Sequence, residues 1–316
     1  MKPFLRSLLL FSTPIFLFVI CEEVYLRNMP SVYREMREQL LENADSIEIL
    51  ILGNSHTTAG INPHLFTLYA QSMAFGSQSL YFDRRITEKY LPILPNLKYV
   101  FISFDYFSLY SEHEESRDFF YKYYYDIDYK NRKFGKEYFL QSFFVYSPKK
   151  TLELMWQQLF PPEGESAVQK GKGWHGWNGH DYEQVASVDW CRGKAAIFNK
   201  TIDSYEGGDA IFQDLESLII TLKSRGITPI LITCPNYSTL RSFFRKEILD
   251  ENKRKADYLV HKHGVLLLDY FEDDSFTYLD YADCDHLNLS GAEKLTTRID
   301  SLIMEMESSR LYNTRE

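Results

Sequence analysis

Five short apolar segments that alternate with helical segments constrain the fold of this chain most. They lie at residues 47–53, 72–75, 98–104, 228–234 and 265–269. Helical patterns separate them at residues 79–90, 211–225, 239–261 and 290–306. Short runs without polar alternation are typical of strands that are buried on both faces of a parallel sheet. The order therefore predicts an α/β fold, a three-layer sandwich around a mostly parallel five-stranded sheet.

A separate apolar segment lies before these five, within residues 1–22. Lys2 and Arg6 come before its apolar core, and Glu22 and Glu23 follow that core. The run is long enough to span a bilayer, and no small-x-small cleavage site follows it. A buried amphipathic helix is disfavoured because both faces are apolar. We interpret the segment as a signal anchor, with a cytoplasmic N-terminus and an extracytoplasmic domain in the periplasm or at the cell surface.

The remaining chain divides by pattern into a helical connector at residues 23–45 and an α/β domain at residues 46–316. An aromatic-rich insertion at about 111–205 interrupts the alternation of strands and helices. A segment this long within a compact domain is usually functional or has elements of its own. We interpret it as a helical subdomain or as a lid over the active site.

Composition excludes several kinds of partner and site. The formal net charge of −9 argues against a nucleic-acid-binding surface, which needs clustered Lys and Arg. The four cysteines lack the close spacing of metal ligands, and His175 and His180 have no convincing carboxylate or cysteine partner. We therefore expect no metal and no cofactor.

The sharpest local pattern is Gly53-Asn54-Ser55 at the carboxyl end of the first predicted strand. Ligands of open α/β sheets bind at this edge. A serine on a tight turn there would expose its hydroxyl, and its amide can point at a developing oxyanion. The alternative is an N-cap serine that carries no chemistry.

A second pattern, Asp283-Cys284-Asp285-His286, precedes the last predicted helix. A catalytic histidine needs a carboxylate on its far nitrogen, and Asp283 can supply it locally to His286. The alternatives are Asp285 or Asn288 as a helix cap and His286 as a surface residue. Topology brings both patterns to the same edge of the sheet, after its first and fifth strands, so together they predict a serine nucleophile with a histidine base.

These residues resemble the SGNH (GDSL-like) hydrolase superfamily. Its first block reads Gly-Asp-Ser, here Gly53-Asn54-Ser55, and its last block reads Asp-x-x-His, here Asp283 to His286. The residues Gly60-Ile61-Asn62-Pro63 look like membrane-anchored members associated with cell-surface polysaccharides. The resemblance covers about 45–110 and 211–305 and implies a flavodoxin-like SGNH fold.

The resemblance also implies an oxyanion hole made by the serine amide, a glycine amide and an asparagine side chain. Ser55 and Gly76 match the first two donors. The asparagine is missing, because Ser103-Phe104-Asp105 stands where the family has Gly-x-Asn. Loss of one such donor costs about 10²–10³ in rate. Tyr106, Gln78 and Asn236 are candidate replacements.

We therefore expect a serine-dependent esterase or O-acyltransferase, favouring acetyl transfer, without a cofactor. By the resemblance and the anchor, its substrate is an acylated polysaccharide or another carbohydrate ester outside the cytoplasm. The rival interpretation is a non-catalytic polysaccharide-binding or assembly protein that keeps the fold. The third interpretation is a thiol enzyme that uses Cys284. It is disfavoured because no separate histidine is placed to serve as its base.

Overall fold

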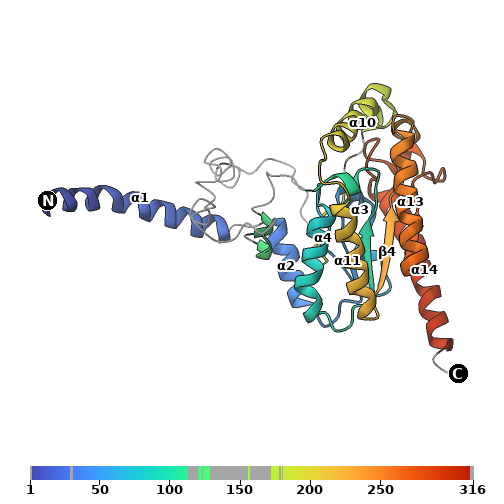
Figure 1. Ribbon diagram of the computed structural model, residues 1–316, viewed down its shortest axis with the longest axis horizontal. Coiled ribbons are helices and arrows are strands. Elements are labelled where there is room, and N and C mark those ends of the chain that lie inside the picture. Colours follow the sequence, from blue (N-terminus) through green and yellow to red (C-terminus); the bar gives the residue numbers. More distant parts are fainter. Residues whose placement is uncertain are drawn as a thin grey trace. The chain divides into compact units, whose positions relative to one another are not determined.

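A computed structural model describes residues 2–28, 31–112, 120–122, 124–128, 156, 172–177, 179 and 181–313 (Figure 1). The chain divides into two compact units. The first comprises Met1–Glu35 and Glu115–Ser166, and the second comprises Met36–Glu114 and Ala167–Glu316. The second unit contains the sheet and both predicted motifs.

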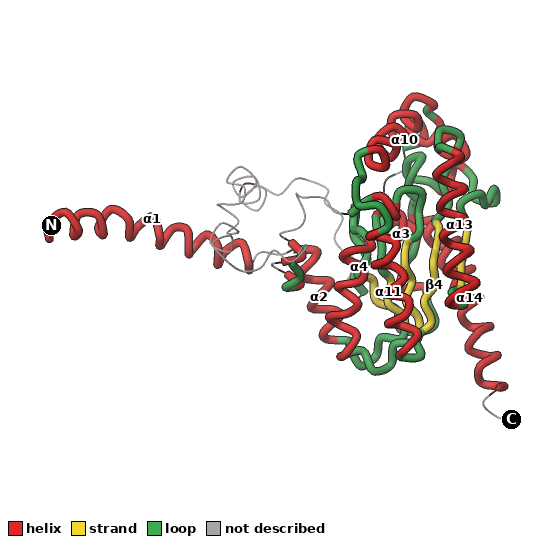
Figure 2. The backbone as a smooth tube through the Cα atoms, in the orientation of Figure 1, coloured by secondary structure: helices red, strands yellow, loops and turns green. Residues whose placement is uncertain are grey.

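The sheet has five strands, all parallel, in the order β2-β1-β3-β4-β5 (Figure 2). Their bounds are β1 Ile49–Ile51, β2 Ala70–Ser72, β3 Tyr99–Ser103, β4 Thr228–Thr233 and β5 Leu266–Asp269. This is the flavodoxin-like order of doubly wound folds. The predicted fold class is confirmed.

Helices cover both faces of this sheet. Contacts between elements place α4, α11 and α13 side by side on one face, while α3 and α14 pack together on the other (Figures 1 and 2). The α-helices are α1 Lys2–Asn28, α2 Val32–Glu42, α3 Ser55–Gly60, α4 Leu80–Tyr90, α9 Tyr182–Ala186, α10 Val188–Asp203, α11 Ala210–Ser224, α12 Ser238–Arg241, α13 Lys246–His263 and α14 Leu289–Asn313. Short 3-10 helices are η1 Pro63–Leu65, η2 Leu91–Ile93, η3 Ser108–Tyr110 and η4 Tyr278–Asp280.

The apolar patterns explain these layers. One stripe of α11 is fully buried, namely Ile211, Leu215, Leu218, Ile219 and Leu222. On the opposite face, alternate residues of β1, β3 and β4 form a core with Leu295, Ile299 and Ile303 of α14. Every strand residue of β1 and β3 is buried, because helices cover both of their faces.

The predicted bounds of three elements are wrong. The last helix was expected at residues 290–306, but α14 continues to Asn313. The second strand was expected at residues 72–75, but β2 ends at Ser72. Residues 73–75 leave the regular ladder, although the N–H groups of Met73 and Phe75 still donate to the carbonyls of Ile51 and Gly53. The loop at residues 73–75 therefore runs alongside the turn that carries Ser55.

The helix expected at residues 239–261 is broken into α12 and α13. The backbone N–H of Arg245 donates to the Tyr106 hydroxyl, and the Phe244 ring stacks on the Tyr106 ring at 4.1 Å. Burial of these aromatic rings beside the end of β3 stabilises the chain more than an unbroken helix would. Sequence periodicity alone could not indicate this.

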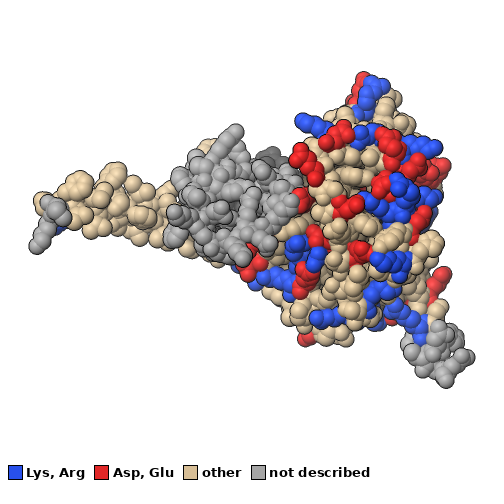
Figure 3. Space-filling model, in the orientation of Figure 1, with Lys and Arg blue, Asp and Glu red and all other residues tan. Residues whose placement is uncertain are grey.

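The described part of the first unit is apolar and aromatic. Pro3–Cys21 of α1 is the one helix among the described residues that is long and apolar enough to cross a membrane, and its side chains are exposed. Figure 3 shows few charged side chains along it, whereas acidic and basic side chains are interspersed on the visible face of the second unit. Tyr33 packs against Phe120, Tyr121, Tyr124 and Tyr125, so those rings form a small aromatic core.

Candidate active site

Ser55 lies on a sharp turn between β1 and α3. Gly53 has φ +126, and a Cβ atom built there would lie 2.4 Å from the Cβ of Ser103. Asn54 is the N-cap, and its side-chain oxygen accepts from the N–H of His56. The cap function is thus filled by Asn54, and Ser55 is the first residue of the helix.

A hydrogen-bonded loop positions His286. Tyr281 and Leu287 form an antiparallel bridge, and the N–H of Ala282 donates to the carbonyl of His286. Within the loop, Asp283 Oδ1 accepts from the backbone N–H groups of Asp285 and His286, at 2.7 and 2.8 Å. The short Asp-x-x-His spacing therefore builds its own turn and fixes the carboxylate beside the imidazole.

The structure brings the three predicted residues together. His286 Nε2 lies 2.9 Å from Ser55 Oγ, and His286 Nδ1 lies 3.0 Å from Asp283 Oδ2 and 3.1 Å from Oδ1. Burial acts to raise the pKa of Asp283, but the hydrogen bond and the charge of His286 outweigh it and lower that pKa. A hydroxyl, an imidazole and a carboxylate in this line can perform nucleophilic catalysis with a general base.

A second charged network, which the sequence patterns did not reveal, lies directly behind these residues. His56 Nδ1 lies 3.1 Å from Asp105 Oδ1, and His56 Nε2 lies 2.8 Å from Asp285 Oδ1. Lys194 of α10 contacts Asp285 Oδ2 at 3.2 Å, and the side chains of His56, Asp105 and Asp285 are almost completely buried. Burial acts to lower the pKa of His56, but the charges of Asp285 and Asp105 outweigh it and raise the pKa well above its ordinary value.

The position of the missing asparagine is occupied by Asp105, which is turned toward this network. Its Oδ2 accepts from Asn54 Nδ2 at 2.8 Å and from the Ser103 hydroxyl. Burial acts to raise the pKa of Asp105, but His56, Ser103 and Asn54 together lower it. An ionised carboxylate cannot donate to an oxyanion, so Asp105 does not take over the role of the asparagine.

The three candidate replacements are engaged elsewhere. The Tyr106 hydroxyl donates to Asn199 Oδ1 and accepts from Arg245 N–H, while Gln78 Nε2 donates to Asp83 and to the Met73 carbonyl. Asn236 Nδ2 lies 3.4 Å from the Asp285 carbonyl. The Ser55 amide is the first of α3, where helix N–H groups lack intrahelical acceptors. Gly76 follows Phe75, whose N–H donates to Gly53, so the loop places Gly76 beside the Ser55 turn.

Asp83 stabilises the turn at Gly53 through hydrogen bonds. Its Oδ1 accepts from Gly53 N–H at 3.1 Å and from Gln78 Nε2 at 2.7 Å. Burial raises the pKa of Asp83 to about 7, against the lowering effect of these two hydrogen bonds. A group whose pKa is higher in the folded than in the unfolded chain binds a proton on folding between the two values. Stability therefore decreases as pH rises from about 4 to about 7.

We expect Asp83→Asn to remove this contribution, because the amide oxygen still accepts both hydrogen bonds and carries no charge. The pH dependence of the unfolding free energy between pH 4 and 7 should become less negative by up to about 1.4 kcal/mol per pH unit. Urea unfolding at several pH values measures it. Asp189→Asn, whose side chain is 90% exposed, is the control and should keep the wild-type slope. Equal slopes for Asp83→Asn and wild type would contradict the prediction.

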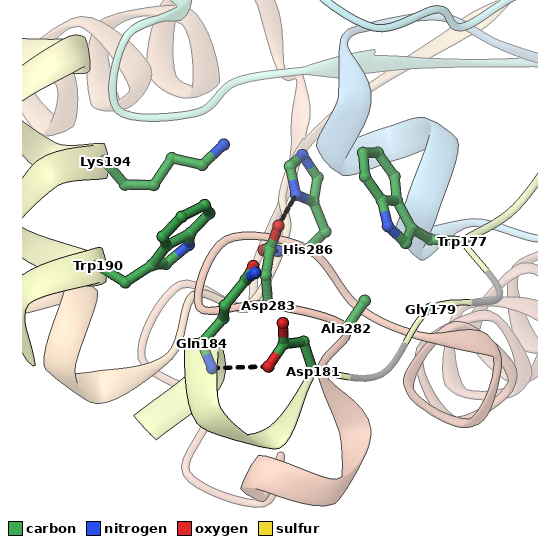
Figure 4. A pocket seen from close by; sticks show the side chains of 9 residues that line it. All are labelled: Trp177, Gly179, Asp181, Gln184, Trp190, Lys194, Ala282, Asp283 and His286. Carbon is green, nitrogen blue, oxygen red and sulfur yellow. Dashed lines mark hydrogen bonds and ion pairs between the residues drawn. The ribbon is translucent and has the colours of Figure 1, made fainter. Parts of the chain in front are cut away.

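A pocket of about 510 Å³ opens beside His286 (Figure 4). The Trp177 ring stacks on the His286 ring, with centroids 4.4 Å apart and planes at 12°. Trp190 and Lys194 of α10 lie on the other side of Asp283 and His286 in Figure 4. Both tryptophans are about two-fifths exposed. The predicted insertion thus contributes the walls of the pocket, through α10 and the segment at residues 172–177.

Within the predicted insertion, the aromatic residues at 174–177 divide into a packing part and a pocket part. Trp174 is buried, and its Nε1 donates to the Thr58 carbonyl at 2.7 Å. His175 packs against Phe75, and burial lowers its pKa to about 4. Trp177 faces the pocket. His180, the other histidine considered as a ligand, lies outside the described residues.

Among the described residues, one group could hold a metal by residue type, namely His56, Asp285 and His286, whose donor atoms lie within 4.8 Å of one another. The 2.8 Å between His56 Nε2 and Asp285 Oδ1 is a hydrogen-bond distance. It is shorter than the roughly 3.3 Å between two ligands of a tetrahedral zinc ion with bonds of about 2.0–2.1 Å. The donors therefore fit a shared proton better than a metal.

No protein-family model matches the chain, and no curated protein matches its sequence. Among solved structures, the chain is similar to a Bacteroides fragilis NCTC 9343 protein described as a candidate acylhydrolase. The two are 13% identical with a TM-score of 0.38, and the match covers 84% of this chain and 96% of that one.

Proposed function

We propose that this chain is a serine-dependent esterase or O-acyltransferase. The observation that carries the proposal is the continuous hydrogen-bonded line Ser55 Oγ, His286 Nε2, His286 Nδ1 and Asp283, with no contact longer than 3.1 Å. It lies at the carboxyl edge of a parallel sheet, where open α/β folds bind ligands, and His286 and Asp283 line a pocket. The resemblance of both motifs to SGNH hydrolases supports the same assignment.

The geometry allows a two-step reaction. Ser55 Oγ attacks the acyl carbonyl while His286 Nε2 accepts its proton, and Asp283 stabilises the resulting imidazolium. The amides of Ser55 and Gly76 donate to the oxyanion. When the tetrahedral species collapses, His286 returns the proton to the leaving alcohol oxygen and the acyl group remains on Ser55. A second hydroxyl then repeats the steps in reverse. Water as that acceptor gives an esterase, and a sugar hydroxyl gives a transferase.

The proposed substrate is an acylated, most simply acetylated, polysaccharide outside the cytoplasm. Helix α1 supports a membrane anchor, and the charges flanking its apolar run support an extracytoplasmic domain. Trp177 and Trp190 supply exposed rings of the kind on which sugar faces stack. The second candidate is a binding or assembly protein without catalysis, which the replacement of the third oxyanion donor by Asp105 favours.

Labelling with a fluorophosphonate probe tests the proposal, because the probe reacts only with an activated serine. We expect stoichiometric labelling of the full chain in detergent micelles, mapped to Ser55 by mass spectrometry and lost in Ser55→Ala and His286→Gln. Ser224→Ala, an exposed serine of α11, is the matched control and should label like the wild type. Absence of labelling in the folded wild-type chain would favour the binding protein.

A further inference from the structure

The charged network of His56, Asp105, Asp285 and Lys194 has one feature that the reaction above does not use, namely a buried histidine between two carboxylates. His56 directs Nδ1 at Asp105 and Nε2 at Asp285, at 3.1 and 2.8 Å. The Nε2 contact is a hydrogen bond, and the Nδ1 contact is an ion pair with poor hydrogen-bond alignment. A neutral imidazole has one N–H, so one ring nitrogen would face a carboxylate with its lone pair. Only the doubly protonated ring satisfies both neighbours.

This cation fixes one oxygen of Asp285 and leaves the other for the active site. Asp285 Oδ1 is bound by His56, while Asp285 Oδ2 lies 3.2 Å from Lys194 Nζ and 3.6 Å from His286 Nε2. The same Nε2 lies 2.9 Å from Ser55 Oγ. The nitrogen that exchanges a proton with Ser55 therefore has a carboxylate as its second neighbour.

We propose that Asp285, held by His56 and Lys194, is a positioning residue that faces Nε2 of His286 and stabilises the imidazolium formed when His286 accepts the Ser55 proton. The proposal rests on the function proposed above for Ser55 and His286. Before transfer, Nε2 presents a lone pair to Asp285 and gains nothing from it. After transfer, Nε2 carries a proton and a positive charge that Asp285 attracts, so the interaction favours the later state.

The charges of the site agree with this role. Three carboxylates, Asp105, Asp283 and Asp285, surround His286 and its neighbours, and two cations, His56 and Lys194, oppose them. One negative charge is left over while His286 is neutral. Protonation of His286 balances the site. Removing either cation would leave two excess negative charges in a buried environment, which is costly.

The same network explains the departure from the SGNH pattern at Asp105. An asparagine there would leave His56 with a counterion on one side only, whereas Asp105 supplies the second one. We therefore interpret His56, directly after Ser55, and Asp105, after β3, as one functional ion pair. Asn54 and Ser103 complete the pair by donating to Asp105 Oδ2.

The titratable groups of the described residues that face this network come from five regions of the second unit. They are His56 of α3, Asp105 after β3, Lys194 and Cys191 of α10, Cys234 at the end of β4, and Asp283, Cys284, Asp285 and His286 of the loop before α14. Burial raises the pKa of Cys234, and the hydrogen bond between Cys191 and Cys284 raises the pKa of Cys284, so these two thiols are neutral at neutral pH. The same hydrogen bond lowers the pKa of Cys191, whose Sγ donates to the Val185 carbonyl at 3.7 Å and so carries its proton. Asp285 and Lys194 are thus the groups of opposite sign whose removal separates the proposal from a purely structural role.

The test is an NMR titration of the full chain in detergent micelles, with histidine labelled at Cε1. The eight histidines can be assigned with single His→Gln variants. We expect His56 to stay protonated above the pH at which an ordinary histidine loses its proton. Asp285→Asn should lower the titration midpoint of His286 by about one pH unit, because a charge 3.6 Å away is removed. Lys194→Met should raise the same midpoint by about half a pH unit, because it leaves Asp285 less neutralised.

Opposite shifts in the two variants would support the proposal, and shifts in the same direction or no shift would overturn it. If Asp285→Asn does not fold, Lys194→Met decides alone, since that side chain lies on the pocket wall and is a quarter exposed. This readout does not need a reactive serine. Loss of fluorophosphonate labelling together with opposite shifts would therefore reject the enzyme and keep the network, whereas labelling without the shifts would do the reverse.

Discussion

Ser55→Ala is expected to reduce hydrolysis of an aryl acetate by about 10⁶-fold, to the rate supported by binding alone. His286→Gln should lose nearly as much, because Ser55 Oγ at 2.9 Å then has no base to accept its proton. Asp283→Asn should lose less, about 10⁴-fold, because the imidazole remains but its orientation and its positive charge are no longer stabilised. The double variant Ser55→Ala/His286→Gln should be no slower than either single variant, since the residues act as a unit.

Initial rates of aryl acetate cleavage by the purified full chain measure these losses, with denatured protein as background. Thr201→Ala, a partly buried residue of α10 far along the chain from both motifs, is a control that should retain the wild-type rate. Multiplicative losses in the double variant would show that Ser55 and His286 act separately. A rate that survives Ser55→Ala would place the nucleophile elsewhere.

Gly53→Ala is expected to have the largest effect on stability among the substitutions considered. The added Cβ would lie 2.4 Å from the Ser103 Cβ and 2.6 Å from the Thr57 hydroxyl, and a φ of +126 is strained for any side chain. Either the turn after β1 or strand β3 must therefore move. We expect the free energy of unfolding to fall by about 3 kcal/mol or more, together with loss of Ser55 labelling.

Thermal and urea unfolding measure this cost, and Gly193→Ala is the matched control. Gly193 lies in α10, and a Cβ added there would meet no atom within 4 Å apart from its chain neighbours and its own helix backbone, so alanine there should stabilise the helix by up to about 1 kcal/mol. A Gly53→Ala chain as stable as the wild type would mean that the turn at Gly53 is not as tight as the structure has it.

Much of the sheet could be predicted because the relevant signals are local. The strands β1, β3, β4 and β5 fall within the predicted apolar runs, and α11 matches the predicted stripe of five buried residues. The errors arise where long-range contacts decide. The break between α12 and α13 depends on Tyr106, which lies more than a hundred residues earlier in the chain.

The candidate site shows the same division. Ser55, Asp283 and His286 could be proposed because each belongs to a short motif whose spacing carries a chemical meaning. His56, Asp105, Asp285 and Lys194 could not be connected in this way. They come from four separate regions of the chain and meet through side-chain directions that no local spacing encodes.

Sequence patterns were sufficient to predict the parallel α/β architecture, the apolar N-terminal helix and the pair of motifs at one edge of the sheet. Periodicity, turn residues and motif spacing are properties of residues that are close in the chain. They influence the local backbone conformation directly, so they can be recognised without the fold. The pairing of Asp105 with His56, and the pocket walls that α10 and Trp177 form beside His286, became visible only in the folded chain. Those contacts depend on how distant elements pack, because burial and charge pairing are settled only when the elements meet.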